Sequence, residues 1–348
     1  MQTITVSIVL PILNERKVIE KTINSLTSQT PFFSLSAKSE NKAFNIALEI
    51  FAVDGGSSDG TLEILESLSQ SDPRLKVINN PQKRTPFALN LGINAARGSF
   101  VGIFSAHCIY EKSYISTCLR KLLETSAAGC SGKLISARFS QDTESMLCHQ
   151  VMSHPFGVSG SSFRTQTEGF VDSIPCGIFR KEILLELGGY NESMLRNQDN
   201  DLNYRIRKAG HKLYLTEETW AEYQEKSSLF SLISYAWNNG SWCGVSSRIQ
   251  PLSLGIRHYT PLIFFLSSAL GPLFYLLFGS WHLTLILLLP IPLHLLFGHI
   301  VALSLLVKNK TLVSLLTPWI FLTFHLTYGF GFLVGSLSFK KLSSSLRR

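Results

Sequence analysis

The N-terminal part of the chain alternates short apolar runs with segments whose apolar residues recur at helical spacing. The runs are rich in β-branched residues and predict strands at 4–11, 46–53, 74–80 and 100–104. The segments between them predict helices that begin at Ile19, Thr61 and Pro86. Strands that alternate with helices in this way favour an α/β fold with a mostly parallel sheet and right-handed crossovers.

After residue 130 the alternation of strand and helix patterns becomes irregular. This is typical of an α+β extension that packs on a nucleotide-binding α/β region. Helices are expected from Lys181 and from near Asp199, the second ending at a glycine C-cap, Gly210. From Ser228 onward, apolar residues at helical spacing predict an amphipathic helix in a membrane interface. A helix that packs two domains together is the alternative.

Two long stretches of the C-terminal part contain no Asp, Glu, Lys or Arg: 259–307 and 311–339. A spanning helix needs roughly 20 apolar residues, so these stretches predict about three membrane segments. The segments are placed at about 260–279, 283–307 and 313–338. The predicted organisation is a catalytic domain, 1–225, an interfacial segment, 226–258, transmembrane helices, 259–339, and a basic tail, 340–348.

Basic residues follow the second and third membrane segments, and both groups are expected on the cytoplasmic side. Three crossings cannot place the catalytic domain, Lys308 and the tail all on that side. Pro272, Pro290 and Pro292 interrupt the first two segments, so a segment that is re-entrant or lies in the interface is the alternative to three crossings. The number of crossings stays open at this point.

The net charge of +8 suits a protein that lies against anionic lipid and handles phosphorylated substrates. The basic residues form no long stripe with interleaved aromatics, which argues against nucleic acid as a partner. Six scattered cysteines without a C-x-x-C pair indicate neither a zinc site nor a disulfide framework. A reducing, cytosolic environment fits this usage.

Two polar clusters directly follow predicted strands. In parallel sheets, ligands bind beyond the carboxyl ends of the strands, which is where these clusters lie. The first is VDGGSSDGT, in which Asp54 can accept hydrogen bonds from a nucleoside and Asp59 orders the turn or caps the next helix. A plain Asx-rich turn is the alternative. The second is Ser105-Ala106-His107, at the end of the strand 100–104. We expect both clusters to share one cleft.

Together, VSIVLPILNE, VDGGSSDGT, AARGSFVGIFSAH and NQDNDLNYRIRKAG resemble the inverting glycosyltransferases of family 2, which have a GT-A fold. The resemblance covers about residues 4–245, and its second half is similar to succinoglycan-biosynthesis glucosyltransferases. It implies a multi-pass enzyme of the inner, or plasma, membrane with a cytoplasmic catalytic domain. Such an enzyme moves a sugar from an NDP-sugar, here a UDP-hexose, to an undecaprenyl-type lipid-linked acceptor in exopolysaccharide or cell-surface glycan synthesis. Polysaccharide assembly proteins are the further partners that the resemblance implies.

The resemblance also implies a donor site, to which the chain contributes Pro11, Asn14, Glu15, Asp54, Gly56, Ser57, Arg84, Ser105 and Ala106. Ser105-Ala106-His107 falls where most members carry D-x-D for Mn²⁺ or Mg²⁺. His107 is therefore the expected metal ligand, and Ser105 is a departure that weakens the site. Imidazole favours Mn²⁺ over Mg²⁺. The alternatives are a metal-independent site in which Arg84 and Arg97 replace the cation, and an inactive site.

In the same comparison, Asp199 of NQDND matches the catalytic base that deprotonates the acceptor hydroxyl. Gln198 replaces a usual Glu, which favours a lower pKa for Asp199, and Asp201 is expected to be structural. A plain N-cap is the alternative for Asp199. The expected acceptor-side residues are His154, Arg164, Asp172, Gln198 and Trp242.

The Q-x-x-R-W motif of processive members is missing around Trp242, which favours transfer of a single sugar. Two rival functions stay open: a polyprenyl-phosphate glycosyltransferase, which needs no strong base, and a non-catalytic scaffold in a polysaccharide assembly. A transporter is disfavoured because the membrane part carries no charge.

Overall fold

The computed structural model describes residues 2–37, 40–137, 142–160, 165–224 and 228–338. The chain forms two compact units. Residues 1–135 and 166–223 make the sheet unit, and residues 136–165 and 224–348 make the helical unit. Residues 136–165, which lie inside the catalytic domain predicted from the sequence, thus group with the membrane-type helices.

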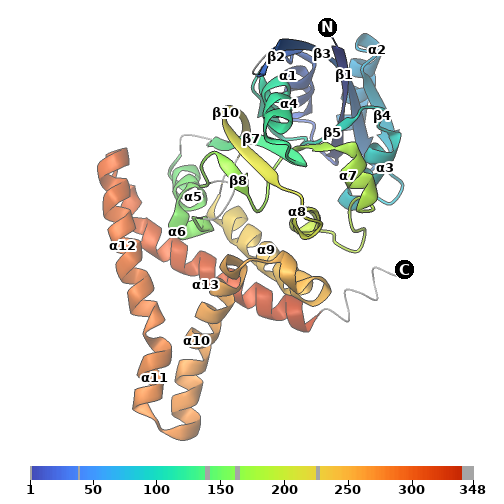
Figure 1. Cartoon of the computed structure of the whole chain (residues 1–348). Helices are drawn as coiled ribbons and strands as arrows, with labels where there is room; N and C mark the ends of the chain where they lie inside the picture. The colour runs from blue at the N-terminus through green and yellow to red at the C-terminus, as the bar shows by residue number, and fades with distance from the viewer. Residues whose placement is uncertain (1, 38–39, 138–141, 161–164, 225–227, 339–348) are drawn as a thin grey trace. The chain divides into compact units, whose positions relative to one another are not determined.

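The centre of the sheet unit is a parallel set of four strands, as the apolar runs predict (Figure 1). β1 (Gln2–Ile12) pairs in parallel with β3 (Glu40–Asp54) on one side and β5 (Phe100–Ile103) on the other. β3 also pairs in parallel with β4 (Leu75–Asn79). In this register Ile12 lies beside Asp54 and Val9 beside Ile103, so the polar residues that follow these strands collect at one edge.

Helices complete the parallel part: α1 (Ile19–Thr27), α2 (Thr61–Ser71) and α3 (Thr85–Ala95). α3 lies tightly on β1, because a Cβ at Gly92 would stand 2.2 Å from Cγ1 of Val9. Leu89 and Ile93 of α3 are buried in the same apolar cluster as Val9. This packing fixes where α3 begins, and with it the side chains at its N-terminus.

The rest of the sheet comprises β2 (Phe32–Ala37), β6 (Cys108–Tyr110), β7 (Gly129–Ala137), β8 (Gly169–Val171), β9 (Ile178–Arg180) and β10 (Leu213–Gln224). Antiparallel pairs join β2 to β3, β9 to both β5 and β7, and β10 to both β6 and β8, so the whole sheet is mixed. The further helices of this unit are α4 (Tyr114–Thr125), α7 (Lys181–Glu186) and α8 (Gln198–Lys208). β6, β8 and β9 have three residues each, too few for a periodic pattern, which explains the loosened signal after residue 130.

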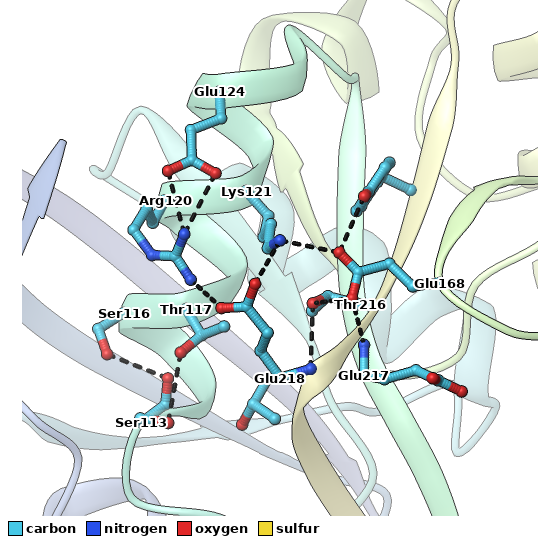
Figure 2. Close-up of polar contacts among 12 residues, drawn as sticks. Ser113, Ser116, Thr117, Arg120, Lys121, Glu124, Glu168, Thr216, Glu217 and Glu218 are labelled. Carbon is cyan, nitrogen blue, oxygen red and sulfur yellow. Dashed lines mark hydrogen bonds and ion pairs between the residues drawn. The ribbon is translucent and has the colours of Figure 1, made fainter. Parts of the chain in front are cut away.

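An ion-pair network joins α4 to β10 and to the residue before β8 (Figure 2). The ammonium group of Lys121 lies between the carboxylates of Glu168 and Glu218, at 2.8 Å from Oε1 of Glu168. Arg120 pairs with Glu218 and, one turn along its own helix, with Glu124. The network therefore connects three segments that are far apart in the sequence.

The helical unit comprises α5 (Thr143–Ser153), α6 (Pro155–Val158), α9 (Leu229–Ile249), α10 (Ile256–Phe278), α11 (Trp281–Leu288), α12 (Pro290–Asn309) and α13 (Thr317–Leu337), with short 3₁₀ turns at Pro251–Ser253 and Leu312–Leu316. Three segments of it are long and apolar enough to cross a membrane: Ile256–Phe278, Trp281–Asn309 and Leu312–Leu337. They match the three segments predicted from charge-free sequence. Within the second segment, Leu289 separates α11 from α12, and Pro290 is the first residue of α12.

α13 packs backbone against backbone on two other helices. A Cβ at Gly335 would stand 1.9 Å from the carbonyl oxygen of Ser241 in α9, and one at Gly240 would stand 2.0 Å from that of Tyr328. On another side of α13, a Cβ at Gly329 would stand 2.1 Å from the carbonyl oxygen of Pro261 in α10. Small residues allow this close approach, which is a common way for apolar helices to associate.

Candidate active site

A cavity of about 380 Å³ opens at the C-terminal ends of β1, β4 and β5 in the sheet unit. β1 contributes Pro11 and Ile12, and the loop after β5 contributes Ser105, Ala106 and His107. The start of α8 closes the opposite wall with Gln198 and Asp199. The structure thus brings Pro11, Glu15, Arg84, the Ser105–His107 cluster, Gln198 and Asp199 together around one space, as a shared cleft requires.

Asp54, Gly56, Ser57 and Asn14 are not among the residues that line this cavity. The Asp54 carboxylate, which is 3% exposed, accepts hydrogen bonds from the amides of Gly56 and Ser57 and from the Ser57 hydroxyl. Asn14 in turn accepts from the amide of Ser58, and its own amide donates to Ser57 Oγ. These contacts are those of the Asx-rich turn, and contact of Asp54 with a nucleoside stays a prediction.

Asp59 orders this turn, as expected from the sequence. Its Oδ1 accepts from the amide and the hydroxyl of Thr61, and its Oδ2 accepts from the amide of Arg16. Hydrogen bonding by Thr61 lowers the pKa of the Asp59 carboxyl. The loop after β1 is therefore tied to the start of α2, which holds the neighbouring Glu15 in place through the bond from its amide to Thr61 Oγ1.

His107 faces Glu15 at the rim of the cavity, with 3.0 Å between Nδ1 and Oε1. The backbone around it is fixed, because Ala106 O accepts from the Thr22 hydroxyl and the amide of Ser105 donates to the Tyr110 hydroxyl. A carboxylate on Nδ1 leaves Nε2 as the ring nitrogen that can take a cation, an arrangement common in metal sites.

The described residues contain no group of three His, Cys, Asp or Glu side chains that would hold a metal by themselves. One imidazole and one adjacent carboxylate nevertheless suit a divalent cation that also takes oxygen ligands from a bound substrate. His107 and Glu15 thus fit a cation that binds together with a diphosphate. They do not fit one that the protein alone retains.

Basic side chains next to the cavity come from the segment before α3. Arg84, the N-cap of α3, and Lys83 both line the cavity. Lys83 has a φ of +54°, which is uncommon outside glycine and is found at functional sites. Sequence reasoning missed Lys83, although it adjoins Arg84. Arg97, the other basic candidate, does not line the cavity, and its amide donates to Glu49.

The Asp199 side chain lies at the cavity and is exposed, at the start of α8. Desolvation by the neighbouring residues raises the pKa of the Asp199 carboxyl to about 6, and the Tyr190 hydroxyl acts on this pKa in the opposite direction. The lower pKa expected from the Glu-to-Gln change at position 198 stays a prediction, since desolvation raises the pKa of Asp199 whatever the neighbouring charge contributes. Asp201 is buried and paired with Arg205 at 2.9 Å, the structural role expected of it.

Three amide oxygens at the cavity, Oδ1 of Asn80, Oε1 of Gln198 and Oδ1 of Asn203, are buried and lack a hydrogen-bond partner in the part of the chain that the structure describes. Buried polar groups are nearly always paired in native proteins. Unpaired acceptors that line one cavity therefore indicate a ligand with several hydrogen-bond donors, such as a sugar or a nucleotide. Asn80 and Asn203 were not identified from the sequence.

Three of the expected acceptor residues, His154, Asp172 and Trp242, are not among those that line this cavity, and their contact with an acceptor stays a prediction. Asp172 is 69% exposed and pairs with Arg207 at 3.4 Å. His154 and Trp242 belong to the helical unit, where His154 Nδ1 accepts from the amide of Phe156 and caps α6. Burial lowers the pKa of His154. Arg164 lies outside the residues that the structure describes.

Residues 7–188, more than half of the chain, match the model of glycosyl transferase family 2. The chain belongs to this family. As a family 2 glycosyltransferase it is an enzyme, and the enzyme class predicted from the motifs is confirmed.

The succinoglycan biosynthesis protein ExoA of Rhizobium meliloti is 29% identical over 73% of this chain and 74% of its own length. A Methanococcus voltae glycosyltransferase is 26% identical over 96% of this chain and 99% of its own length; its name gives a dolichyl N-acetylglucosaminyl phosphate as acceptor and a diacetamido-dideoxy-glucuronosyl group as the transferred sugar. Among solved structures, a mannosyltransferase of Pyrobaculum calidifontis in complex with GDP-Man and Mn²⁺ aligns with a TM-score of 0.56 at 16% identity, over 95% of this chain and 86% of its own. The GT-A fold is thereby confirmed.

Proposed function

We propose that this family 2 glycosyltransferase is membrane-bound and inverting, and that it moves a single sugar from an NDP-sugar to a lipid-linked saccharide. The observation that carries the proposal is one cavity holding basic side chains, unpaired amide oxygens and the Asp199 carboxylate. The basic side chains suit a diphosphate, and the amide oxygens suit sugar hydroxyls. The Asp199 carboxylate suits removal of a proton from the acceptor.

The donor side of the proposal rests on the part of the cavity between β1, β5 and α3. Lys83 and Arg84 supply positive charge for the donor diphosphate, and His107 with Glu15 would hold a divalent cation bound with it. A cation in that place offsets charge that develops on the leaving diphosphate. The mannosyltransferase solved with GDP-Man and Mn²⁺ supports a cation of this kind, and imidazole ligation favours Mn²⁺ over Mg²⁺.

On the acceptor side, Asp199 takes the proton of the attacking hydroxyl. The hydroxyl oxygen bonds to the anomeric carbon as the bond from that carbon to the diphosphate breaks, and the nucleoside diphosphate leaves with the electron pair. Attack from the opposite face inverts the anomeric centre, so an α-linked donor gives a β-linked product. A raised pKa suits this role, because the carboxyl is a stronger base than an ordinary aspartate yet is still ionised at neutral pH.

The lipid-linked acceptor is proposed from two further observations. Three apolar segments in the helical unit are long enough to span a membrane, which supports an enzyme that meets its acceptor in the membrane. The Methanococcus voltae relative, similar over nearly its full length, is named for a lipid phosphate that already carries a sugar. We place the catalytic face in the cytoplasm, where NDP-sugars are made, at the inner or plasma membrane.

The test is transfer by the detergent-purified full chain from a panel of UDP- and GDP-sugars. Acceptors are undecaprenyl diphosphate carrying one sugar and undecaprenyl phosphate alone, each with Mn²⁺, Mg²⁺ or EDTA. We expect a β-linked product on the saccharide acceptor, Mn²⁺ dependence, and loss of transfer in Asp199→Asn. Glu186→Gln, which changes an exposed carboxylate on α7 of the same unit, is the matched control and keeps wild-type transfer.

Transfer to the bare lipid phosphate that survives Asp199→Asn would replace this proposal with a polyprenyl-phosphate glycosyltransferase. Failure to turn over any donor in the panel would instead favour the scaffold function.

A further inference from the structure

α9 and α13 lie side by side and run in the same direction (Figure 1). A Cβ at Gly240 of α9 would meet the carbonyl oxygen of Tyr328 in α13, and a Cβ at Gly244 would meet that of Phe332. A step of four residues along α9 thus corresponds to a step of four residues along α13. Because the two helices advance together, the start of α13 lies beside the start of α9 and not beside its end.

The apolar segments between these two helices form a hairpin, with α10 as one limb and α11 with α12 as the other. The limbs are joined by a turn at Gly279, which has a φ of +61°. Next to the turn, the ring centroids of Tyr275 and Trp281 lie 4.2 Å apart, and farther from it the rings of Phe264 and His294 stack at 4.9 Å. The limbs are therefore antiparallel, and we call them the α10–α12 hairpin.

A hairpin returns the chain to the side of the membrane from which it left. α10 begins at Ile256, directly after the turn that follows α9, and α13 begins at Thr317, directly after the 3₁₀ turn that follows α12. The end of α9 and the start of α13 are therefore on one side. Since parallel packing puts the start of α13 beside the start of α9, both ends of α9 lie on that side. Neither α9 nor α13 then crosses the membrane.

The contacts of α13 with the hairpin agree with this conclusion. Pro318, near the start of α13, lies against Gly298 of α12, and Gly329, about three turns on, lies against Pro261 of α10. α13 thus passes from one limb to the other, away from the turn of the hairpin, and runs across both limbs (Figure 1). A helix that runs across two spanning limbs lies along the membrane surface.

The basic residues of the helical unit gather at the open end of the hairpin. Those that the structure describes are Arg248 in the last turn of α9, Arg257 at the start of α10, and Lys308 and Lys310 at the end of α12. The sequence from 259 to 307, which includes the turn of the hairpin, contains no charged residue. Basic residues next to membrane segments favour the cytoplasmic side, so the open end is expected there.

The composition of α9 and α13 also suits a membrane surface. Phe230 of α9 is 83% exposed and Trp319 of α13 is 54% exposed. α9 carries Asn238, Asn239 and Arg248 as well, and it is not among the described segments that are apolar enough to cross. Exposed aromatic side chains together with polar ones are typical of helices that lie in the interface.

We propose that the chain crosses the membrane only by the α10–α12 hairpin, and that α9 and α13 bind the bilayer surface on the side of the sheet unit. The chain from Gln224, the end of β10, to Leu229, the start of α9, spans at most about 18 Å, less than the roughly 30 Å of a hydrocarbon core. The start of α9 is therefore on the side of the sheet unit. With two crossings, the catalytic domain, Lys308 and the basic tail all share that side. The proposal rests on the membrane location in the proposed function.

The experiment labels the full chain with a membrane-impermeant maleimide in spheroplasts and in inside-out vesicles of a bacterial host. Single cysteines are introduced by Ser280→Cys in the turn of the hairpin, Lys310→Cys after α12 and Ser344→Cys in the tail. Glu186→Cys, at an exposed position on α7, is the control that reports the side of the sheet unit. Mass spectrometry of the labelled peptides separates each new thiol from the native cysteines.

We expect Ser280→Cys to be labelled only in spheroplasts and the other three variants only in inside-out vesicles. A second readout leaves the chain itself unaltered: trypsin should remove a C-terminal epitope tag in inside-out vesicles and leave it in place in spheroplasts. Neither readout depends on enzymatic activity.

Labelling of Ser344→Cys from the side opposite to Glu186→Cys would show that α13 crosses, and would overturn the proposal. Labelling of Ser280→Cys from the same side as Glu186→Cys would also overturn it, since the hairpin would then not reach the far side. The proposed function fails in a different way. If Glu186→Cys, Lys310→Cys and Ser344→Cys were labelled only in spheroplasts and Ser280→Cys only in vesicles, the two crossings would be supported and the cytoplasmic catalytic face refuted.

Discussion

Nδ1 of His107 lies 3.0 Å from Oε1 of Glu15, although 92 positions separate the two residues in the chain. Glu15 follows β1 and His107 follows β5, and these strands are parallel neighbours. The pair therefore arises from the sheet order, and it orients the imidazole that the sequence singles out as a metal ligand.

Glu15→Gln should weaken Mn²⁺ binding about 10- to 100-fold, the usual cost of losing the carboxylate behind a metal-bound histidine. His107→Ala should abolish the tight component of binding. The measurement is Mn²⁺ titration in the presence of UDP, followed by electron paramagnetic resonance. Glu20→Gln, an exposed carboxylate on α1, is the matched control. Equal Mn²⁺ affinity in all four proteins would contradict a cation at His107.

Asp199→Asn should lower kcat about 10²- to 10⁴-fold, the range of a positioned general base, without a comparable change in donor KM. The same substitution should stabilise the folded protein although it lowers activity. The folded protein raises the pKa of Asp199 from 3.8 to about 6, so the ionised carboxylate destabilises the fold above about pH 6 and the cost is absent below about pH 4. The variant should therefore melt at a higher temperature than wild type at pH 8 and at the same temperature at pH 3.5. A lower melting temperature at pH 8 would contradict the raised pKa.

Cys176 is the one partly exposed cysteine of the six, and it lines the cavity. N-ethylmaleimide should therefore react first with Cys176, and UDP or GDP with Mn²⁺ should slow the reaction if the nucleotide occupies this cavity. Mass spectrometry of the labelled chain measures both effects, and Cys176→Ser is the control. Unchanged labelling in Cys176→Ser would show that another thiol is more accessible, and labelling indifferent to every nucleotide would place the donor elsewhere.

Lys121→Ala should destabilise the sheet unit by roughly 1 kcal/mol at pH 7, since it leaves two carboxylates of a partly exposed network without their cation. This network lowers the pKa values of Glu168 and Glu218 in the folded protein. The two carboxylates therefore stabilise the fold above the ordinary glutamate pKa, and this stabilisation is lost as the pH falls through their lowered pKa values. The melting-temperature difference from wild type should thus shrink toward pH 3. Lys208→Ala, at an exposed position on α8, should show no difference at either pH.

The parallel half of the sheet and the three membrane-type segments were predictable because each carries a long, uninterrupted pattern. The Ser105–His107 cluster and Asp199 could be placed near one another because strand ends of a parallel sheet share an edge. Tyr190, which lines the cavity, could not be found in this way: its position depends on the turn at Gly188 and Gly189 and on Asn90, 100 positions away. Lys83 was missed because its backbone conformation, not its sequence, distinguishes it from other surface lysines.

The expected acceptor residues show the limit of composition. His154 carries no feature in the sequence that separates a ligand-binding imidazole from one that caps a helix. In the structure its Nδ1 accepts from the Phe156 amide, and its contact with an acceptor stays a prediction. Asp172 is similar, since its pairing with Arg207 requires the fold to bring β8 and α8 together.

The glycines of α13 give this helix an uneven tolerance to mutation that no hydropathy profile would reveal. Gly329 and Gly335 meet carbonyl oxygens of α10 and α9, whereas Phe330, between them, is 45% exposed. Replacing Phe330 by another apolar residue leaves the backbone contacts intact, while alanine at either glycine forces two helices apart. A saturation screen of this helix would therefore show intolerant positions among permissive ones, and the apolar character that makes the segment recognisable would be its most replaceable property.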